Sequence, residues 1–274
     1  MKSILLFLAI FLVALLTSCG GGSSTPLANP NVQTSKLMYG APIAFYLGVS
    51  QLNQGVTLNA TLCSNLVQVV SPSPLYLAYS CTPNGSGTMV FTATDTSGKV
   101  LLSQNFTVPD PQVTMVTSMG TIVLDLNPNA APRTVTNFLQ YVSSGFYSNL
   151  IFHRVIPGFV IQSGGFMTGM SPVNPPYASI NLETPNGLSN LTGTLAMART
   201  SDPNSATSQF YINVADNSNL DYIDSNNPGY AVFGKVVTGL DVVNAIAKVP
   251  TQSVGAYSDV PVSDVNIISV SRTQ

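Results

Sequence analysis

Short apolar stretches separated by polar breaks fill the chain from about residue 37 to residue 108. The breaks contain Pro, Gly, Asn and Ser and recur at intervals of roughly ten residues, the spacing expected of a β-sandwich. We therefore expect residues 37–108 to form a small, immunoglobulin-like β-sandwich. Its predicted strands are residues 42–49, 56–62, 66–70, 75–81, 88–94 and 100–108.

A second pattern begins after a connector that holds two prolines within three residues. Proline fixes its backbone, so we expect this linker, residues 109–112, to be stiff. Two further strands, residues 113–117 and 121–126, flank a turn. A helix is then predicted to begin at Pro132, which suits a first turn, and to end at Gly145. The apolar positions that follow helical spacing are Val135, Phe138, Leu139 and Val142.

The first residues are expected to form a targeting segment rather than part of a folded domain. Residues 4–16 are apolar, follow a short positive start, and are too few to span a bilayer as a stable helix. They lead into Leu-Thr-Ser-Cys, which resembles a bacterial lipoprotein signal in which Cys19 is lipidated. An ordinary secretory signal with a chance cysteine is the alternative. We expect residues 1–18 to be the signal peptide and residues 19–36 to be a flexible tether.

A lipid on Cys19 would anchor the mature chain to the membrane by its acyl chains. We therefore expect the protein in the bacterial cell envelope, facing the periplasm. The residue after Cys19 is glycine, where aspartate would favour retention in the inner membrane of enteric bacteria. This residue favours the outer membrane.

Composition fits an exported protein. Of the 274 residues, 45% are hydrophobic and only 7% are charged, against a typical quarter, and the formal net charge is -2. The length suggests two domains, of which the second would be residues 113–274. No basic run is present, so we expect no nucleic-acid partner. The acidic residues Asp221 and Asp224 lie in a stretch rich in Asn, Ser and Gly and are expected to be solvated turn residues.

Two further cysteines, Cys63 and Cys81, end predicted strands of the sandwich. In an oxidising compartment they are expected to form a disulfide, which would stabilise a small domain by ~3 kcal/mol. A pair of free thiols or a metal site are the alternatives. The only histidine, His153, is far away and no CxxC spacing occurs, so a metal site is disfavoured and we expect no metal and no cofactor.

The most informative stretch is residues 152–165, which combines Arg154 with large apolar residues in a chain poor in charge. Burying a cation without partners costs free energy, so an arginine among apolar residues indicates a specific structural or functional role. We expect Arg154 and Gln162 to line the rim of a groove with Phe159 as its apolar floor. A guanidinium can donate hydrogen bonds or hold an anion but cannot act as a general base. A surface arginine beside a core strand is the alternative.

Several ordered motifs in the second domain carry a family resemblance that covers about residues 112–271. They are residues 137–139, 145–147, 152–164 (FHRVIPGFVIQSG), 193–199 (GTLAMAR), 204–212 (NSATSQFYI) and 230–236 (YAVFGKV). In this order they resemble the cyclophilin family of peptidyl-prolyl isomerases, and most closely its bacterial periplasmic subgroup. The resemblance implies a closed eight-stranded antiparallel β-barrel capped by two helices.

The resemblance also implies roles for individual residues. As catalytic residues it assigns Arg154, which would donate to the prolyl nitrogen, and Gln162. The implied substrate-binding residues are Phe159, Val160, Tyr211 and Leu220 around the proline ring, Gln162 and Gln209 on the substrate backbone, Ala198 and Arg199 beside the preceding residue, and Tyr230 and His153 at the rim. Tyr211 stands where most relatives have Phe, and its added hydroxyl needs a partner.

We therefore expect a monomeric, lipid-anchored prolyl isomerase that binds proline-containing polypeptides and assists the folding of cell-envelope or exported proteins. A non-catalytic proline-peptide-binding module or chaperone anchored to the membrane is the main alternative. A hydrolase that uses His153 is another, although no nucleophile motif accompanies it. A third alternative is that the sandwich carries the main function and the isomerase is an accessory.

Overall fold

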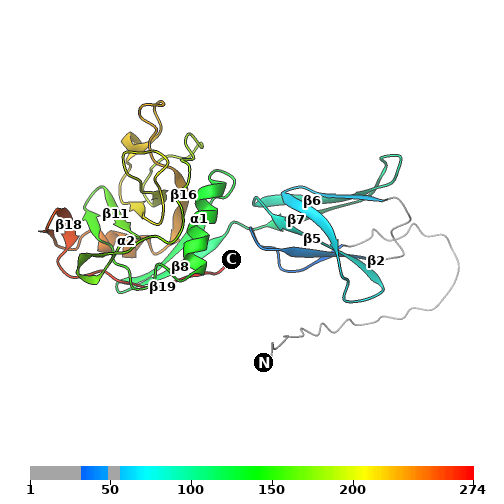
Figure 1. Ribbon diagram of the computed structural model, residues 1–274, viewed down its shortest axis with the longest axis horizontal. Coiled ribbons are helices and arrows are strands. Elements are labelled where there is room, and N and C mark those ends of the chain that lie inside the picture. Colours follow the sequence, from blue (N-terminus) through cyan, green and yellow to red (C-terminus); the bar gives the residue numbers. More distant parts are fainter. Residues whose placement is uncertain (1–31, 49–55) are drawn as a thin grey trace, which may run out of the picture.

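The computed structural model describes residues 32–48 and 56–274. The predicted signal peptide, Cys19 and most of the predicted tether lie outside these residues. Two domains lie side by side, and a short segment after β7 (Val100–Val108) leads into β8 (Gln112–Thr117) of the second domain (Figure 1). Within the described ranges, no helix is both long enough and apolar enough to cross a bilayer.

The first domain consists of two antiparallel sheets. One has four strands in the order β1-β2-β5-β4, and the other has three in the order β3-β6-β7. Their bounds are β1 Gln33–Thr34, β2 Ile43–Gly48, β3 Thr57–Ala60, β4 Cys63–Val69, β5 Tyr76–Pro83, β6 Gly87–Thr94 and β7 Val100–Val108. Every second residue of β2 is buried, as a strand with one wet face requires. The buried Phe45 packs against Phe91 of β6, with ring centroids 4.8 Å apart, so the two sheets share a core.

All six predicted strands of this domain are confirmed to within a few residues, but its N-terminal boundary was predicted wrongly. Residues up to 36 were assigned to the tether, whereas β1 pairs with β2 and Val32 is only 4% exposed. The Val32 N–H donates to the Gln104 side chain at 2.7 Å. The end of the predicted tether therefore belongs to the first domain, and a two-residue strand is too short to show a periodic pattern.

Cys63 and Cys81 are joined by a disulfide, with their Cα atoms 5.7 Å apart. Their strands, β4 and β5, are neighbours in the four-stranded sheet, which places the two residues within the usual range for such a bond.

The second domain is built around a curled, antiparallel, eight-stranded sheet with the order β10-β11-β15-β14-β16-β9-β8-β19. Backbone hydrogen bonds from Phe152 to Val265 (2.9 Å) and from Ile267 to Leu150 (2.7 Å) link the segments beside its two end strands. The strands are β8 Gln112–Thr117, β9 Gly120–Leu126, β10 Arg154–Ile156, β11 Val160–Ser163, β14 Thr194–Met197, β15 Phe210–Asn213, β16 Val232–Thr238 and β19 Ile267–Arg272.

Two α-helices and several small elements complete the domain. They are α1 Pro132–Ser143, α2 Leu240–Ile246, the strand pairs β12 Phe166–Met167 with β13 Ser171–Pro172 and β17 Thr251–Val254 with β18 Tyr257–Pro261, and the short 3-10 helices η2 Thr168–Met170 and η3 Ser218–Leu220. The eight-stranded sheet and the two helices agree with the predicted architecture.

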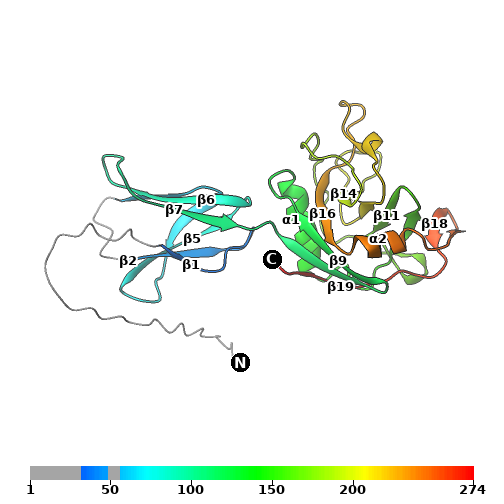
Figure 2. The same cartoon turned by 180° about the vertical axis from the view of Figure 1, so that it is seen from behind.

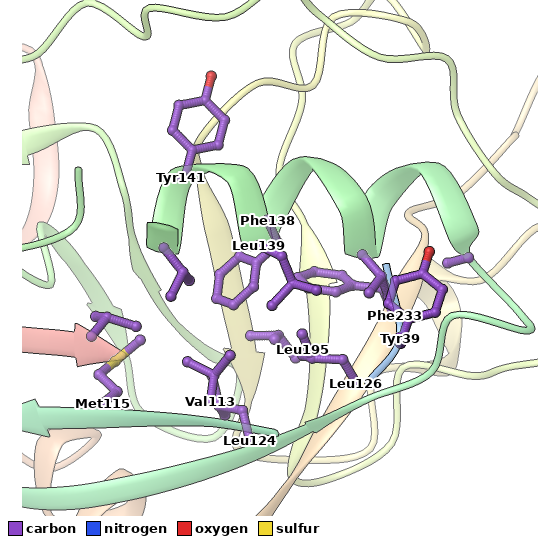
Figure 3. Packing of buried hydrophobic residues seen from close by; sticks show 14 of the residues in the cluster. Tyr39, Val113, Met115, Leu124, Leu126, Phe138, Leu139, Tyr141, Leu195 and Phe233 are labelled. Atoms are coloured by element: carbon purple, nitrogen blue, oxygen red, sulfur yellow. The ribbon is translucent and has the colours of Figure 1, made fainter. Parts of the chain in front are cut away.

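Helix α1 forms where its sequence predicted. Its predicted apolar residues are all buried, and Phe138 and Leu139 point from the helix toward the side chains of the sheet (Figure 3). The ring of Phe138 lies 5.3 Å from that of Phe233 in β16. After the helix ends, Gly145 adopts a φ of 72°, the left-handed conformation that glycine tolerates best.

The two domains also touch through side chains. Tyr39 of the first domain lies beside α1 (Figure 3), with its hydroxyl 3.1 Å from Oγ1 of Thr136. Asn129 reaches back from the second domain, accepting from the Ser86 N–H at 3.0 Å and donating to the Ser86 carbonyl at 3.1 Å. The C-terminus lies near the same junction (Figure 2). The linker is therefore reinforced by contacts on both sides of it.

Candidate active site

The site begins with the hairpin of β10 and β11. Arg154 and Gln162 are cross-strand partners in it, so their side chains emerge on the same face. Arg154 Nη1 donates to Gln162 Oε1 at 3.4 Å. The turn between the strands contains Gly158 with a φ of 71°, a conformation that a residue with a side chain seldom adopts.

A second hydrogen bond extends this pair. Gln162 Nε2 donates to Oε1 of Gln209 at 3.0 Å. Gln209 lies immediately before β15, the strand that pairs with β11. Arg154, Gln162 and Gln209 thus form one chain of polar side chains, which we call the polar chain.

Beside the polar chain lies a hollow of about 300 Å³. All the residues predicted for the site line it except Gln209 and His153. The lining residues are Arg154, Phe159, Val160, Gln162, Ala198, Arg199, Tyr211, Leu220 and Tyr230. Val160 and Tyr211 are buried and form an apolar cluster with Ala196 and Val232, which gives the hollow a firm floor.

At the rim of this hollow, within the part of the chain that the structure describes, Arg154 lies beside an aromatic ring rather than a carboxylate. The guanidinium carbon of Arg154 lies 5.9 Å from the ring centroid of Phe159, and no carboxylate is among the described residues that line the hollow. Its remaining N–H groups can therefore donate to a molecule that enters.

The Tyr211 hydroxyl has the partner that its burial requires. It donates to Oδ1 of Asn190 at 2.8 Å, and burial raises the pKa of Tyr211 well above its usual range. Asn190 is fully buried and in turn donates its backbone N–H and its Nδ2 to Oδ1 of Asp221, both at 2.8 Å. The tyrosine is thereby held from behind, with its ring facing the hollow.

The interpretation of Asp221 as a solvated turn residue was wrong. Partial burial would raise its pKa, but hydrogen bonds from Ser189 and Asn190 outweigh that effect and lower it. Asp224 is indeed a turn residue, because it is exposed and accepts from the N–H groups of Asn226 and Asn227 at 2.8 Å. The role of Asn190 and Asp221 in supporting Tyr211 was not predicted from the sequence. The one signal for it was that the hydroxyl of Tyr211 would need a polar partner.

Residues 112–272 match the family model described as "Cyclophilin type peptidyl-prolyl cis-trans isomerase/CLD". The chain belongs to the cyclophilin family. It is a peptidyl-prolyl cis-trans isomerase.

Relatives and solved structures agree with this assignment. The chain is 51% identical over 173 residues to a peptidyl-prolyl cis-trans isomerase of Acinetobacter baylyi, covering 63% of this chain and 90% of that one. It is 50% identical over 164 residues to peptidyl-prolyl cis-trans isomerase B of Escherichia coli, covering 59% and 99%. A cyclophilin type isomerase structure from Cryptosporidium parvum superimposes with a TM-score of 0.53 at 27% identity, over 60% of this chain and 98% of that one.

In this cyclophilin, Arg199 and Tyr230 form one side wall of the hollow. The guanidinium of Arg199 lies 4.5 Å from the ring centroid of Tyr230 and donates to the carbonyl of Gly229 at 2.8 and 3.0 Å. Ala198 uses its N–H to donate to the carbonyl of Gln209 at 3.0 Å. Strand pairing with a substrate would therefore have to use the carbonyl of Ala198 or the backbone of Arg199.

His153 was expected at the rim but is only 5% exposed. Its ring lies 4.7 Å from that of Phe166, and burial together with the neighbouring Arg154 lowers its pKa to about 4. His153 is therefore neutral at physiological pH. It does not line the hollow that Phe159, Val160, Tyr211 and Leu220 share with Arg154.

Proposed function

We propose that this cyclophilin accelerates X-Pro isomerisation in polypeptides that fold in the bacterial cell envelope, and that a lipid on Cys19 anchors it there, facing the periplasm. The apolar run before Cys19, the low content of charge and the disulfide in the first domain support this setting, because disulfides persist in oxidising compartments. The outer membrane is the favoured anchor site.

The chemistry needs neither a nucleophile nor a metal. The barrier to X-Pro rotation is ~18–20 kcal/mol and arises from the partial double bond of the amide. In the twisted state the prolyl nitrogen regains a lone pair and can accept a hydrogen bond. A fixed donor aimed at that nitrogen stabilises the twisted state more than either planar state, which lowers the barrier.

One observation carries this mechanism: Arg154 lies at the edge of a small hollow with an apolar floor, and no carboxylate is among the described residues that line it. We assign Arg154 as the donor, with Gln162 orienting it. Phe159, Val160, Tyr211 and Leu220 surround the proline ring. Gln209 extends the polar contacts toward the substrate backbone.

The test is Arg154→Ala in an isomerisation assay with a short proline-containing peptide. Removing one preorganised donor is expected to lower kcat/KM by about 10²-fold or more, with the thermal unfolding curve unchanged. Arg133→Ala is the matched control, because Arg133 is exposed on α1 and does not line the hollow. Full activity of the Arg154 variant would reject the proposed role of the arginine.

The anchor is tested separately. In a bacterial host, the full chain should incorporate a clickable fatty acid and fractionate with membranes, whereas Cys19→Ser should do neither. Labelling of the Cys19→Ser variant, or a wild-type chain that stays soluble and unlabelled, would remove the lipid anchor from the proposal and leave the isomerase untouched.

For the first domain we propose an immunoglobulin-like sandwich that separates the isomerase from the membrane. The two small sheets and their shared core support this proposal. The alternative of a non-catalytic binding module or chaperone is less well supported, since the polar chain of the isomerase is intact. The family model matches residues 112–272, and 59% of this chain matches 99% of the Escherichia coli relative, so an isolated 112–274 fragment should retain activity. An inactive but folded fragment would give the sandwich a direct part in catalysis.

A further inference from the structure

A second hollow borders the polar chain and shares Arg154 and Gln162 with the one that we assign to the proline ring. It has a volume of about 400 Å³, within the range of sites that hold small organic groups. All three members of the polar chain line it, together with three aromatic residues, His153, Phe166 and Tyr257. We call it the ring pocket. Because Arg154 and Gln162 border both hollows, a substrate bound at one can reach the other.

The wall of the ring pocket is a row of rings from two strands, β12 and β18, and from His153, which immediately precedes β10. The Phe166 ring lies 4.7 Å from the His153 ring on one side and 5.1 Å from the Tyr257 ring on the other, at interplanar angles of 48° and 72°. Tyr257 comes from β18, which packs beside β10. Tilted and edge-to-face pairs of this kind are the arrangements that aromatic rings prefer.

Tyr257 is the open end of this row. Its side chain is 45% exposed, whereas Phe166 is 7% exposed. β18 lies at the end of the second domain that points away from the first domain (Figures 1 and 2), so the first domain leaves it uncovered. A guest ring can therefore approach Tyr257 from solvent.

The positive charge at the ring pocket favours an aromatic group as the bound ligand. No carboxylate is among the described residues that line it, and Arg154 is its one permanent charge. On the side of the other hollow Arg154 approaches the ring of Phe159, at 5.9 Å. A planar aromatic guest in the ring pocket would lie against both the guanidinium and the aromatic row, which combines a cation–π contact with edge-to-face packing.

We propose that the ring pocket binds an aromatic side chain of the substrate, placed within two residues of the isomerised proline, and that Tyr257 determines this specificity. The inference rests on the proposed placement of the proline ring in the first hollow, the one lined by Phe159, Val160, Tyr211 and Leu220. It makes the enzyme selective for proline sites flanked by Phe, Tyr or Trp.

The experiment uses the full chain and a set of alanine-based peptides that each contain one proline. Phe, Leu or Ala is placed in turn at each of the two positions before the proline and each of the two positions after it. Isomerisation is followed by NMR exchange, which needs no auxiliary protease. At one position Phe should raise kcat/KM about tenfold over Ala, mainly through a lower KM, because the contact is made equally in ground and transition states. Leu at that position should gain less than half of this factor.

The variant that decides the matter is Tyr257→Ala, for which the Phe-to-Ala ratio of kcat/KM should fall to within about twofold of unity. Tyr257→Phe should restore the ratio, because the ring and not the hydroxyl is used. Val254→Ala is the control, since Val254 is exposed on the same hairpin but does not line the ring pocket. A ratio near unity at every position in the wild type, equal gains from Leu and Phe, or an unchanged ratio in Tyr257→Ala would overturn the proposal. Absence of isomerisation of the alanine peptide by the wild type would instead contradict the isomerase function.

Discussion

At the scale of single residues, the site depends on side chains that are held from behind. Tyr211 presents its ring to the hollow because Asn190 binds its hydroxyl, and Asn190 is held by Asp221. Arg154 is likewise steadied by Gln162. Fixed side chains cost less ordering entropy when a substrate binds, which is the physical value of such support.

Asn190 should therefore matter more for stability than the tyrosine hydroxyl that it binds. Asn190→Ala leaves two buried donors, the Tyr211 hydroxyl and Asn213 Nδ2, without this acceptor. It should lower the free energy of unfolding by about 2–3 kcal/mol, whereas Tyr211→Phe should cost about 1 kcal/mol. Urea denaturation measures both changes. Asn226→Ala, on an exposed turn, is the control and should change stability by less than about 0.5 kcal/mol. Equal losses for Asn190→Ala and Asn226→Ala would contradict the supporting role.

The buried His153 makes stability depend on pH. Its folded-state pKa of about 4 lies below the unfolded value near 6.5, so the unfolded chain binds a proton more readily. The stabilising contribution is complete above pH 6.5 and is lost as the pH falls toward 4, where it should have decreased by about 3 kcal/mol. Urea denaturation from pH 7 to pH 4 should therefore show a shallower decline for His153→Gln than for the wild type. Parallel declines would show that His153 does not titrate in this way.

At the scale of elements, the hairpin of β10 and β11 brings the site together because its register pairs Arg154 with Gln162. The helix α1 is fixed by a residue far along the chain. Glu183 accepts hydrogen bonds from the first-turn N–H groups of Arg133 (3.0 Å) and Thr134 (2.8 Å), and from the Thr134 hydroxyl (2.7 Å). A carboxylate at this end of a helix also interacts favourably with the helix dipole.

Glu183→Ala should accordingly lower the free energy of unfolding by about 1–2 kcal/mol, and Glu183→Gln by less, because the amide keeps one acceptor. Asp241→Ala provides the comparison, since Asp241 lies in the first turn of α2 and its side chain makes no capping hydrogen bond. Its loss should amount to a few tenths of a kcal/mol. Thermal or urea unfolding measures all three, and equal effects of Glu183→Ala and Asp241→Ala would contradict the capping role.

At the scale of the whole molecule, two domains of different character meet at a polar junction. The hydroxyl of Tyr39, the amide of Asn129 and the guanidinium of Arg272 all reach across it, the last donating to the Tyr39 carbonyl at 2.8 Å. These contacts orient the isomerase relative to the first domain. In the proposed setting they would also orient it relative to the membrane.

The two domains are therefore expected to tumble as one body, with equal rotational correlation times from ¹⁵N relaxation. Asn129→Ala combined with Tyr39→Phe removes side-chain hydrogen bonds across the junction and should make the two correlation times diverge. Asn226→Ala should leave them equal. Domains that tumble independently in the wild type would show that the junction does not hold in solution.

The sequence alone determined those features whose signal is local. Short apolar stretches between breaks of Pro, Gly, Asn and Ser predicted the strands of the first domain, and helical spacing predicted α1. The family motifs predicted the residues around Arg154, because each motif keeps its catalytic residues within a few positions of one another. The short strand β1 has too few residues to show a period. The predicted tether, residues 19–36, therefore extended into the first domain.

Only the tertiary structure decided which distant residues meet. Asn190 reaches Tyr211 and Asp221 from a loop, and Tyr257 of β18 reaches Phe166 of β12, although no periodicity in the sequence predicts either contact. The contact of Tyr39 with α1 likewise depends on how one domain settles on another. Patterns of polarity specify which face of an element is buried, whereas the packing of the whole chain specifies which side chain it is buried against.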